Sequence, residues 1–68
     1  MSAYKVISVV GTSTKSWEDA TQTAVSAAAK SLRDLRIAKV VDMDVTVDKK
    51  GKITQYRCRV DLSFKYEI

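Results

Sequence analysis

The segment YRCRVDLSFKYEI, from Tyr56 to Ile68, decides the fold. Apolar side chains occupy every second position: Tyr56, Cys58, Val60, Leu62, Phe64, Tyr66 and Ile68. Polar and charged residues fill the positions between them: Arg57, Arg59, Asp61, Ser63, Lys65 and Glu67. Alternation over so many residues indicates a β-strand with one apolar and one polar face. We expect this strand to begin at Ile53.

This strand is too long for the rest of the chain to bury. From Ile53 to Ile68 it would span about 50 Å, at ~3.3 Å per residue. The single helix that we predict, Trp17 to about Leu35, covers about 28 Å at ~1.5 Å per residue. Half of the apolar row would therefore be bare in a monomer, and bare strands associate. We predict that the chain is a subunit of a closed homo-oligomer.

The predicted helix has a clear beginning and a continuous apolar stripe. Ser16 is a good N-cap, and Glu18 and Asp19 place negative charge at the positive end of the helix dipole. The apolar stripe repeats with a helical period: Trp17, Ala20, Ala24, Ala28, Leu32 and Leu35. Because alanines make this face flat, a sheet can wrap closely around it.

Two further strands are predicted. Residues 3–10 are rich in β-branched and aromatic side chains, and the loop 11–14 follows them. Residues 37–48 alternate between apolar and polar side chains. Adjacent Val40 and Val41 interrupt that alternation, which indicates either a bulge or a change of environment.

The order of these elements constrains the topology. Lys49-Lys50-Gly51-Lys52 is a short hairpin turn, so the last two strands are antiparallel. The first strand then lies on the other side of the third. We therefore predict an α+β fold, β-α-β-β, in which a three-stranded antiparallel sheet wraps around one helix. Residues 1–68 form a single domain.

Composition excludes several classes of protein. Cys58 is the only cysteine and there is no histidine, so neither an internal disulfide nor the usual tetrahedral zinc site can form within one chain. The 12 lysines and arginines are scattered rather than grouped on one face, so we expect no nucleic-acid partner. No apolar run approaches the ~20 residues of a membrane span, so we expect no membrane partner. A lone thiol without a signal-peptide pattern favours the cytoplasm.

No catalytic constellation is present in the sequence. There is no histidine base, no nucleophile elbow and no glycine-rich phosphate loop. Cys58 lies in the apolar row with no histidine to activate it, so we expect it to be buried packing. We predict that the chain is not an enzyme.

The sequence resembles a known family, the dodecins. Residues 10–13 and 16–20 are similar to the loop and helix start of that family, and residues 32–36 and 56–65 continue the match over nearly the whole chain. The resemblance implies a β-α-β-β subunit that assembles into a hollow dodecamer of cubic symmetry. It also implies storage or sequestration of riboflavin and related flavins, stacked in pairs between aromatic side chains at a subunit junction.

Two positions depart from the flavin-binding members. Those members carry a tryptophan directly after the helix end, where this chain has Ile37, and a glutamine after the tyrosine of the third strand, where it has Arg57. Isoleucine has no π-face on which an isoalloxazine ring can stack. The resemblance therefore implies weakened or lost binding of riboflavin or FMN at a ligand site formed by Ile37, Asp44, Thr46 and Arg57.

Asp42, Asp44 and Asp48 alternate along one face of the second predicted strand. Carboxylate oxygens of this kind suit Ca²⁺ or Mg²⁺, although the spacing is not that of an EF-hand. In a ring of subunits the same aspartate can meet its copies at a symmetry axis. The dodecin family also includes calcium-binding members that lack the flavin tryptophan. A metal site at these aspartates is one hypothesis, and a solvated strand face is the alternative.

Arg57, Arg59 and Trp17 each have two interpretations. The arginines lie on the polar face of the third predicted strand, where they can bind phosphates of a nucleotide or coenzyme. They can equally pair with Asp44 or Asp61 between subunits. Trp17 could serve as a displaced stacking platform, but it begins the apolar stripe, so we expect it to pack against the core.

The leading functional hypothesis is a non-enzymatic, dodecin-like oligomer that stores a small ligand, with its flavin capacity weakened or lost. The main rival is a shell that stores calcium or another metal on the aspartate face. A third hypothesis is a shell with a purely structural role.

The oligomer is tested by the mass of the native protein in solution. We expect a closed assembly, with twelve subunits as the mass that the resemblance implies. Light scattering coupled to size exclusion measures this mass directly. A well-folded monomer would contradict the prediction.

Overall fold

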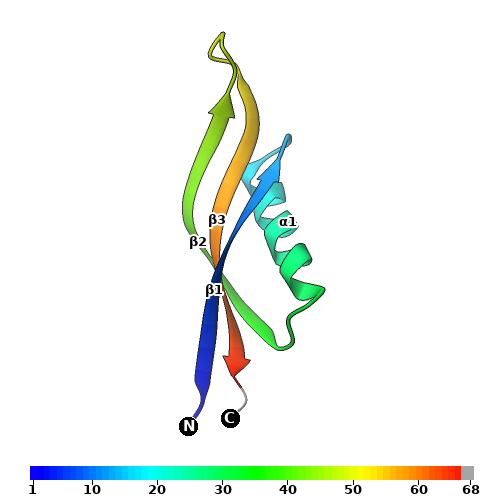
Figure 1. The fold of residues 1–68 in the computed structure, drawn as a ribbon, viewed down its shortest axis with the longest axis vertical. Helices are drawn as coiled ribbons and strands as arrows, with labels where there is room; N and C mark the ends of the chain where they lie inside the picture. The colour runs from blue at the N-terminus through cyan, green and yellow to red at the C-terminus, as the bar shows by residue number, and fades with distance from the viewer. Residues whose placement is uncertain (67–68) are drawn as a thin grey trace.

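The computed structural model describes residues 1–66, which form three long strands and one helix. In chain order the elements are β1 (Ala3–Ser13), α1 (Trp17–Ala29), β2 (Leu35–Val47) and β3 (Ile53–Tyr66). Figure 1 shows the three strands as one strongly twisted sheet with α1 beside it. Within residues 1–66, no helix has the length and apolar character of a membrane span. The part of the predicted third strand at residues 67–68 lies outside the described residues.

The sheet has the order β1-β3-β2, and both neighbouring pairs are antiparallel. Val60 of β3 lies between Val9 of β1 and Val40 of β2. The β-α-β-β order and the central position of β3 confirm the predicted α+β fold. The predicted bulge is also present, because the register of β2 against β3 shifts between Val40 and Asp42.

Helix α1 begins as predicted but ends earlier. The Ser16 hydroxyl caps the helix by accepting a hydrogen bond of 3.0 Å from the backbone N–H of Asp19. The predicted extension to Leu35 is wrong, because α1 ends at Ala29 and Leu35 begins β2. The reversal uses Asp34 in the left-handed region, at φ 59°. Leu32 and Leu35 still pack against the core, which is why they follow the helical period without belonging to the helix.

Gly11 lies inside β1 rather than in a loop. The predicted loop over residues 11–14 is wrong for its first three positions, because β1 continues to Ser13, opposite Tyr56. The glycine is needed where α1 crosses the strand. A Cβ at this position would lie 2.0 Å from the carbonyl oxygen of Ala20 and 2.9 Å from the Cβ of Ala24. Close packing of the helix, and not a turn, therefore requires glycine here.

The core lies between α1 and the middle of β3. The alanine stripe of the helix meets the inward side chains of the strand, all of them buried: Ala20, Ala24, Ala28, Cys58, Val60 and Leu62. Burial of Cys58 confirms its predicted role in packing. These six residues are small or of medium size, so the helix sits close to the sheet.

The helix does not cover the whole apolar face. It packs on β1 and β3, while the inward residues Val40 and Met43 of β2 are 43% and 55% exposed. The β2–β3 hairpin extends beyond the helix in Figure 1, and Val47 and Ile53 near its tip are exposed as well. The subunit is 52 Å long and only 14 Å thick. One subunit thus leaves a large apolar area for other copies to bury.

The two glycines allow a matched test of this packing. Gly11→Ala should destabilise the fold by about 3 kcal/mol, because the new methyl group overlaps the helix backbone. Gly51→Ala should cost about 1 kcal/mol, because it strains only a turn residue at φ 80° that has open space around it. Urea unfolding at equal subunit concentration measures both losses. Equal losses would contradict the close approach of α1 at Gly11.

Candidate ligand site on the outer face of the sheet

The outer face of the sheet is the face turned away from α1. Since Cys58, Val60 and Leu62 of β3 point toward the helix, the residues that alternate with them point to the outer face. These residues are Arg57, Arg59, Asp61 and Ser63. Their partners on β2 are, in the same order, Asp44, Asp42, Lys39 and Ile37.

Opposite charges face one another on three neighbouring positions of the outer face. Asp44 is opposite Arg57, Asp42 is opposite Arg59, and Lys39 is opposite Asp61. Facing pairs of opposite charge stabilise a sheet, whereas like charges in these positions would repel. The bulge at Val41 produces this match. Without the extra residue, Val41 would face Arg59 and Asp42 would point into the core.

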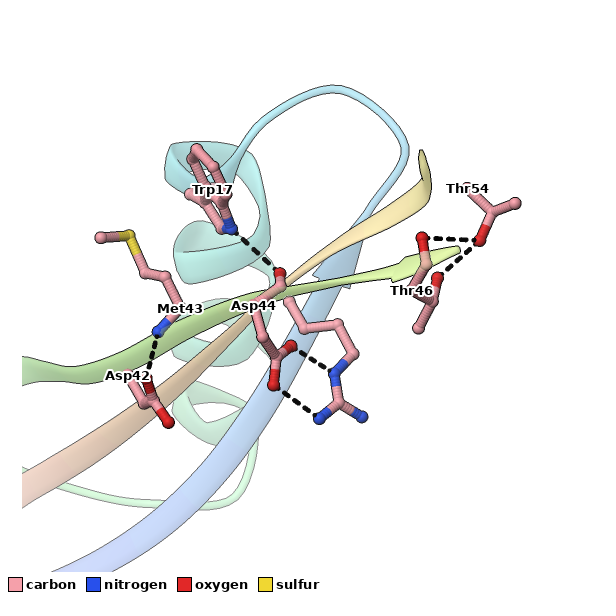
Figure 2. A network of polar contacts seen from close by, with 7 residues as sticks. Trp17, Asp42, Met43, Asp44, Thr46 and Thr54 are labelled. Atoms are coloured by element: carbon pink, nitrogen blue, oxygen red, sulfur yellow. Dashed lines mark hydrogen bonds and ion pairs between the residues drawn. The ribbon is translucent and has the colours of Figure 1, made fainter. Parts of the chain in front are cut away.

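The closest of these pairs is the one between Asp44 and Arg57. The Arg57 Nε donates to Asp44 Oδ1 at 2.6 Å and its Nη2 donates to Oδ2 at 3.0 Å, so the guanidinium holds both carboxylate oxygens (Figure 2). The hydrogen bond from Arg57 lowers the pKa of Asp44, and the positive charges of Arg57 and Arg59 add to this effect. The same hydrogen bond raises the pKa of Arg57. Both side chains are about half exposed, at 43% for Arg57 and 50% for Asp44.

A small cavity lies beside this ion pair. It has a volume of about 40 Å³ and is lined by Val10, Asp42, Asp44, Arg57 and Arg59. Asp42 uses Oδ1 to accept a hydrogen bond of 3.0 Å from the backbone N–H of Met43 (Figure 2). A space of this size accommodates one water molecule or one ion. The cavity thus brings together two of the three predicted metal ligands.

Asp48, the third predicted metal ligand, has a different role. Its Oδ1 accepts hydrogen bonds from the backbone N–H groups of Lys50 and Lys52, at 2.8 and 3.0 Å. It therefore closes the hairpin turn, where Gly51 has a positive φ of 80°. Within residues 1–66 no three acidic or cysteine side chains are grouped closely enough to hold a metal ion. A site with more than two carboxylates would need other subunits.

The residues implied as flavin contacts are spread along the outer face. Ile37 lies opposite Ser63 and is 57% exposed. Ser63 and Arg57 are about 20 Å apart along β3, at ~3.3 Å per residue. Ile37 and Arg57 therefore do not meet within one subunit. Thr46 lies near the hairpin, where its Oγ1 is 2.6 Å from that of Thr54 (Figure 2).

Trp17 links the helix to the back of the candidate site. Its indole Nε1–H donates a hydrogen bond of 3.1 Å to the carbonyl oxygen of Asp44 (Figure 2). Its ring meets Tyr56 edge to face, with centroids 5.1 Å apart, and Cys58 Sγ lies 3.4 Å from its carbonyl oxygen. Trp17 therefore packs against Tyr56, but it is 36% exposed and lies outside the core that we expected it to join. No sequence pattern signalled the bond to Asp44, because it joins residues that are close only in the folded chain.

The dodecin sequence family matches residues 3–67. The chain belongs to the dodecin family. The calcium dodecin of Mycobacterium tuberculosis is 51% identical to it over 65 residues, which cover 96% of this chain and 90% of that relative. This β-α-β-β dodecin is thus similar over nearly its whole length to a family member named for calcium.

Solved structures of dodecins are also similar to this chain. The crystal structure of the calcium-chelating calcium dodecin of M. tuberculosis, reported with a novel calcium-binding site, matches with a TM-score of 0.84 and 47% identity, over 97% of this chain and 93% of that one. A variant of the Thermus thermophilus dodecin matches with a TM-score of 0.90 and 31% identity over 100% of both chains. Dodecins are homo-oligomers that bind small ligands or ions, and this chain is a storage protein of that kind.

The ion pair on the outer face should give the stability of this dodecin a pH dependence. Asp44→Asn should lower the melting temperature slightly at pH 7, because it removes a half-exposed pair. The folded state lowers the pKa of Asp44, so the pair stabilises the protein above the ordinary aspartate pKa of about 3.9 and loses this effect as pH falls through the lowered pKa.

Thermal unfolding of the native protein and of Asp44→Asn at pH 7 and at successively lower pH checks this. The difference between the two melting temperatures should begin to shrink below the ordinary aspartate pKa and vanish below the lowered pKa of Asp44. Asp42→Asn is the matched control, because the Asp42 carboxylate accepts a hydrogen bond from the backbone of Met43 rather than from an arginine. A difference between native protein and Asp44→Asn that persists unchanged in acid would contradict the prediction.

Proposed function

We propose that this dodecin forms a closed shell of twelve subunits that stores Ca²⁺ and has lost most of the family's capacity for flavin. The observation that carries the proposal is the position of Asp42 and Asp44, which lie next to one another on the outer face and line one cavity of about 40 Å³. Hard carboxylate oxygens are the ligands that Ca²⁺ prefers. The 51% identity to a protein named calcium dodecin supports the choice of ion.

The proposed site requires several subunits. Ca²⁺ takes six to eight oxygen ligands, and two carboxylates supply at most four. Asp48 is engaged in the hairpin turn, so it does not complete the set within the same subunit. In a symmetric shell the missing oxygens come from copies of the same outer face. Binding of Ca²⁺ and assembly of the shell would then depend on each other.

Loss of flavin binding follows from the chemistry of Ile37 and Arg57. Ile37 presents an exposed aliphatic side chain where the flavin-binding members have an aromatic ring. Each aromatic stacking contact contributes about 0.5–1.5 kcal/mol beyond the burial of area, and a paired site would lose several of them. Arg57 is already engaged with Asp44, so its guanidinium is not free to replace the amide of the family's glutamine.

The proposed shell lies in the cytoplasm and is not an enzyme. A cytoplasmic location is consistent with Cys58, a buried free thiol. The residues that line the outer cavity are two aspartates, two arginines and a valine, without a nucleophile paired to a base. The proposed shell therefore binds and releases its ligand without converting it.

Calorimetric titration of the assembled protein with Ca²⁺ tests the proposal. Native protein should bind Ca²⁺ and gain thermal stability, while Asp42→Asn and Asp44→Asn should each weaken binding at least tenfold, since each removes a charged ligand. Asp48→Asn is the matched control, because it alters a turn carboxylate outside the cavity. It should leave Ca²⁺ affinity nearly unchanged. Neither heat nor a thermal shift with native protein would exclude calcium storage.

Riboflavin fluorescence provides the complementary measurement. Native protein should not quench it, whereas Ile37→Trp should restore some quenching by supplying the missing π-face. Strong quenching by native protein would favour flavin storage over the proposed function. A shell that binds neither ligand would favour a structural role.

A further inference from the structure

Arg57 occupies the carboxylate that the proposed cation needs. Its guanidinium engages both oxygens of Asp44, at 2.6 and 3.0 Å. A fork-shaped contact of this kind engages the carboxylate oxygens that a bidentate Ca²⁺ would use. A guanidinium and a calcium ion cannot both hold Asp44 in this way.

The neighbouring groups make exchange between the two cations feasible. Arg57 and Asp44 are about half exposed, so the long arginine side chain can leave the carboxylate and remain in solvent. Asp42, which lines the cavity, has its Oδ1 engaged by the backbone of Met43, which leaves its Oδ2 available. The cavity already holds two arginines, so an added divalent ion gains more attraction once Arg57 has moved away.

We propose that Arg57 is a built-in competitor for the cation. In the cation-free protein it holds Asp44 in a bidentate geometry, and Ca²⁺ binds by replacing it. Arg57 thereby sets the concentration of Ca²⁺ at which the site fills. This inference rests on the proposed function, since it assigns a regulatory role to a residue of the same site.

The exchange also gives the site a preference between divalent ions. Ca²⁺ accepts both oxygens of a carboxylate, whereas Mg²⁺ is smaller, keeps several of its waters and usually contacts a carboxylate through one oxygen. Arg57 covers both oxygens of Asp44, so it competes with all of the contact that Ca²⁺ makes but with more than Mg²⁺ needs. Removal of Arg57 should therefore increase the affinity for Ca²⁺ more than that for Mg²⁺.

The test compares two arginines that differ in their contacts. Arg57 and Arg59 are neighbours on the outer face, each is opposite an aspartate and both line the cavity. Arg57 is held by Asp44, while no ion pair of Arg59 is present within residues 1–66. Arg57→Gln and Arg59→Gln each remove one positive charge from the site. A difference between them isolates the effect of direct competition from that of charge alone.

Titration of the assembled variants with Ca²⁺ and with Mg²⁺ should show this difference. We expect Arg57→Gln to bind Ca²⁺ about tenfold more tightly than native protein, a typical size for coupling between two bound groups. Arg59→Gln should change Ca²⁺ affinity about twofold, and the ratio of Ca²⁺ to Mg²⁺ affinity should rise in Arg57→Gln alone. Arg57→Lys keeps the charge but not the two-pronged contact, so its Ca²⁺ affinity should lie between those of native protein and Arg57→Gln. Fluorescence of Trp17, the only tryptophan, is a second readout, since its indole bonds to Asp44.

The outcomes separate this inference from the proposed function. If native protein binds Ca²⁺ but Arg57→Gln binds it no more tightly, or gains no more than Arg59→Gln, competition by Arg57 is wrong and calcium storage stands. If neither native protein nor Arg57→Gln binds Ca²⁺, both are wrong. Should Arg57→Gln fail to assemble, Arg57→Met keeps the apolar stem of the side chain and makes the same comparison.

Discussion

The structure depends on the close contact between the alanine stripe of α1 and the centre of the sheet. Ala20 and Ala24 can approach β1 only because Gly11 has no side chain there. This contact buries Cys58, Val60 and Leu62 on the inward face of β3. It also fixes the helix over β1 and β3, away from β2. The uncovered remainder is what makes a solitary subunit unfavourable and a closed assembly the soluble state.

The outer face follows from the same contact. Because a strand has only two faces, burial of Cys58, Val60 and Leu62 commits their alternating neighbours to the other side. The bulge at Val41 shifts the alternation of β2 by one residue. Only because of this shift do Asp42 and Asp44 face the arginines of β3. A single extra residue therefore determines whether Asp42 belongs to the core or to the candidate site. Fold and site are linked through this register, rather than through a separate loop.

The sequence predicted those features that local periodicity specifies. The alternation of β3, the alanine stripe, the Ser16 cap and the bulge at Val41 all depend on neighbouring residues. The predictions from the sequence were wrong where one residue pattern fits two different local structures. Leu32 and Leu35 keep the helical period because they face the core, although they follow the helix. The sequence places Gly11 in a loop because its steric partner, Ala20, is adjacent to it only in the folded chain. The bond from Trp17 to Asp44 could not be predicted for the same reason. The bonds of Asp48 are local, and the preference of aspartate for turns is the signal that could have indicated them.

The charge of the outer face bears on how a basic subunit can hold a cation. The chain carries a formal charge of +4, which on average repels cations. Around the cavity, however, each aspartate faces an arginine, so the four side chains sum to zero. In the empty site Asp44 is paired with Arg57, while Asp42 accepts a hydrogen bond from the backbone of Met43. Under the proposed exchange, an ion that enters displaces Arg57 into solvent. The same side chain returns when the ion leaves, so filling and emptying would need no rearrangement of the sheet.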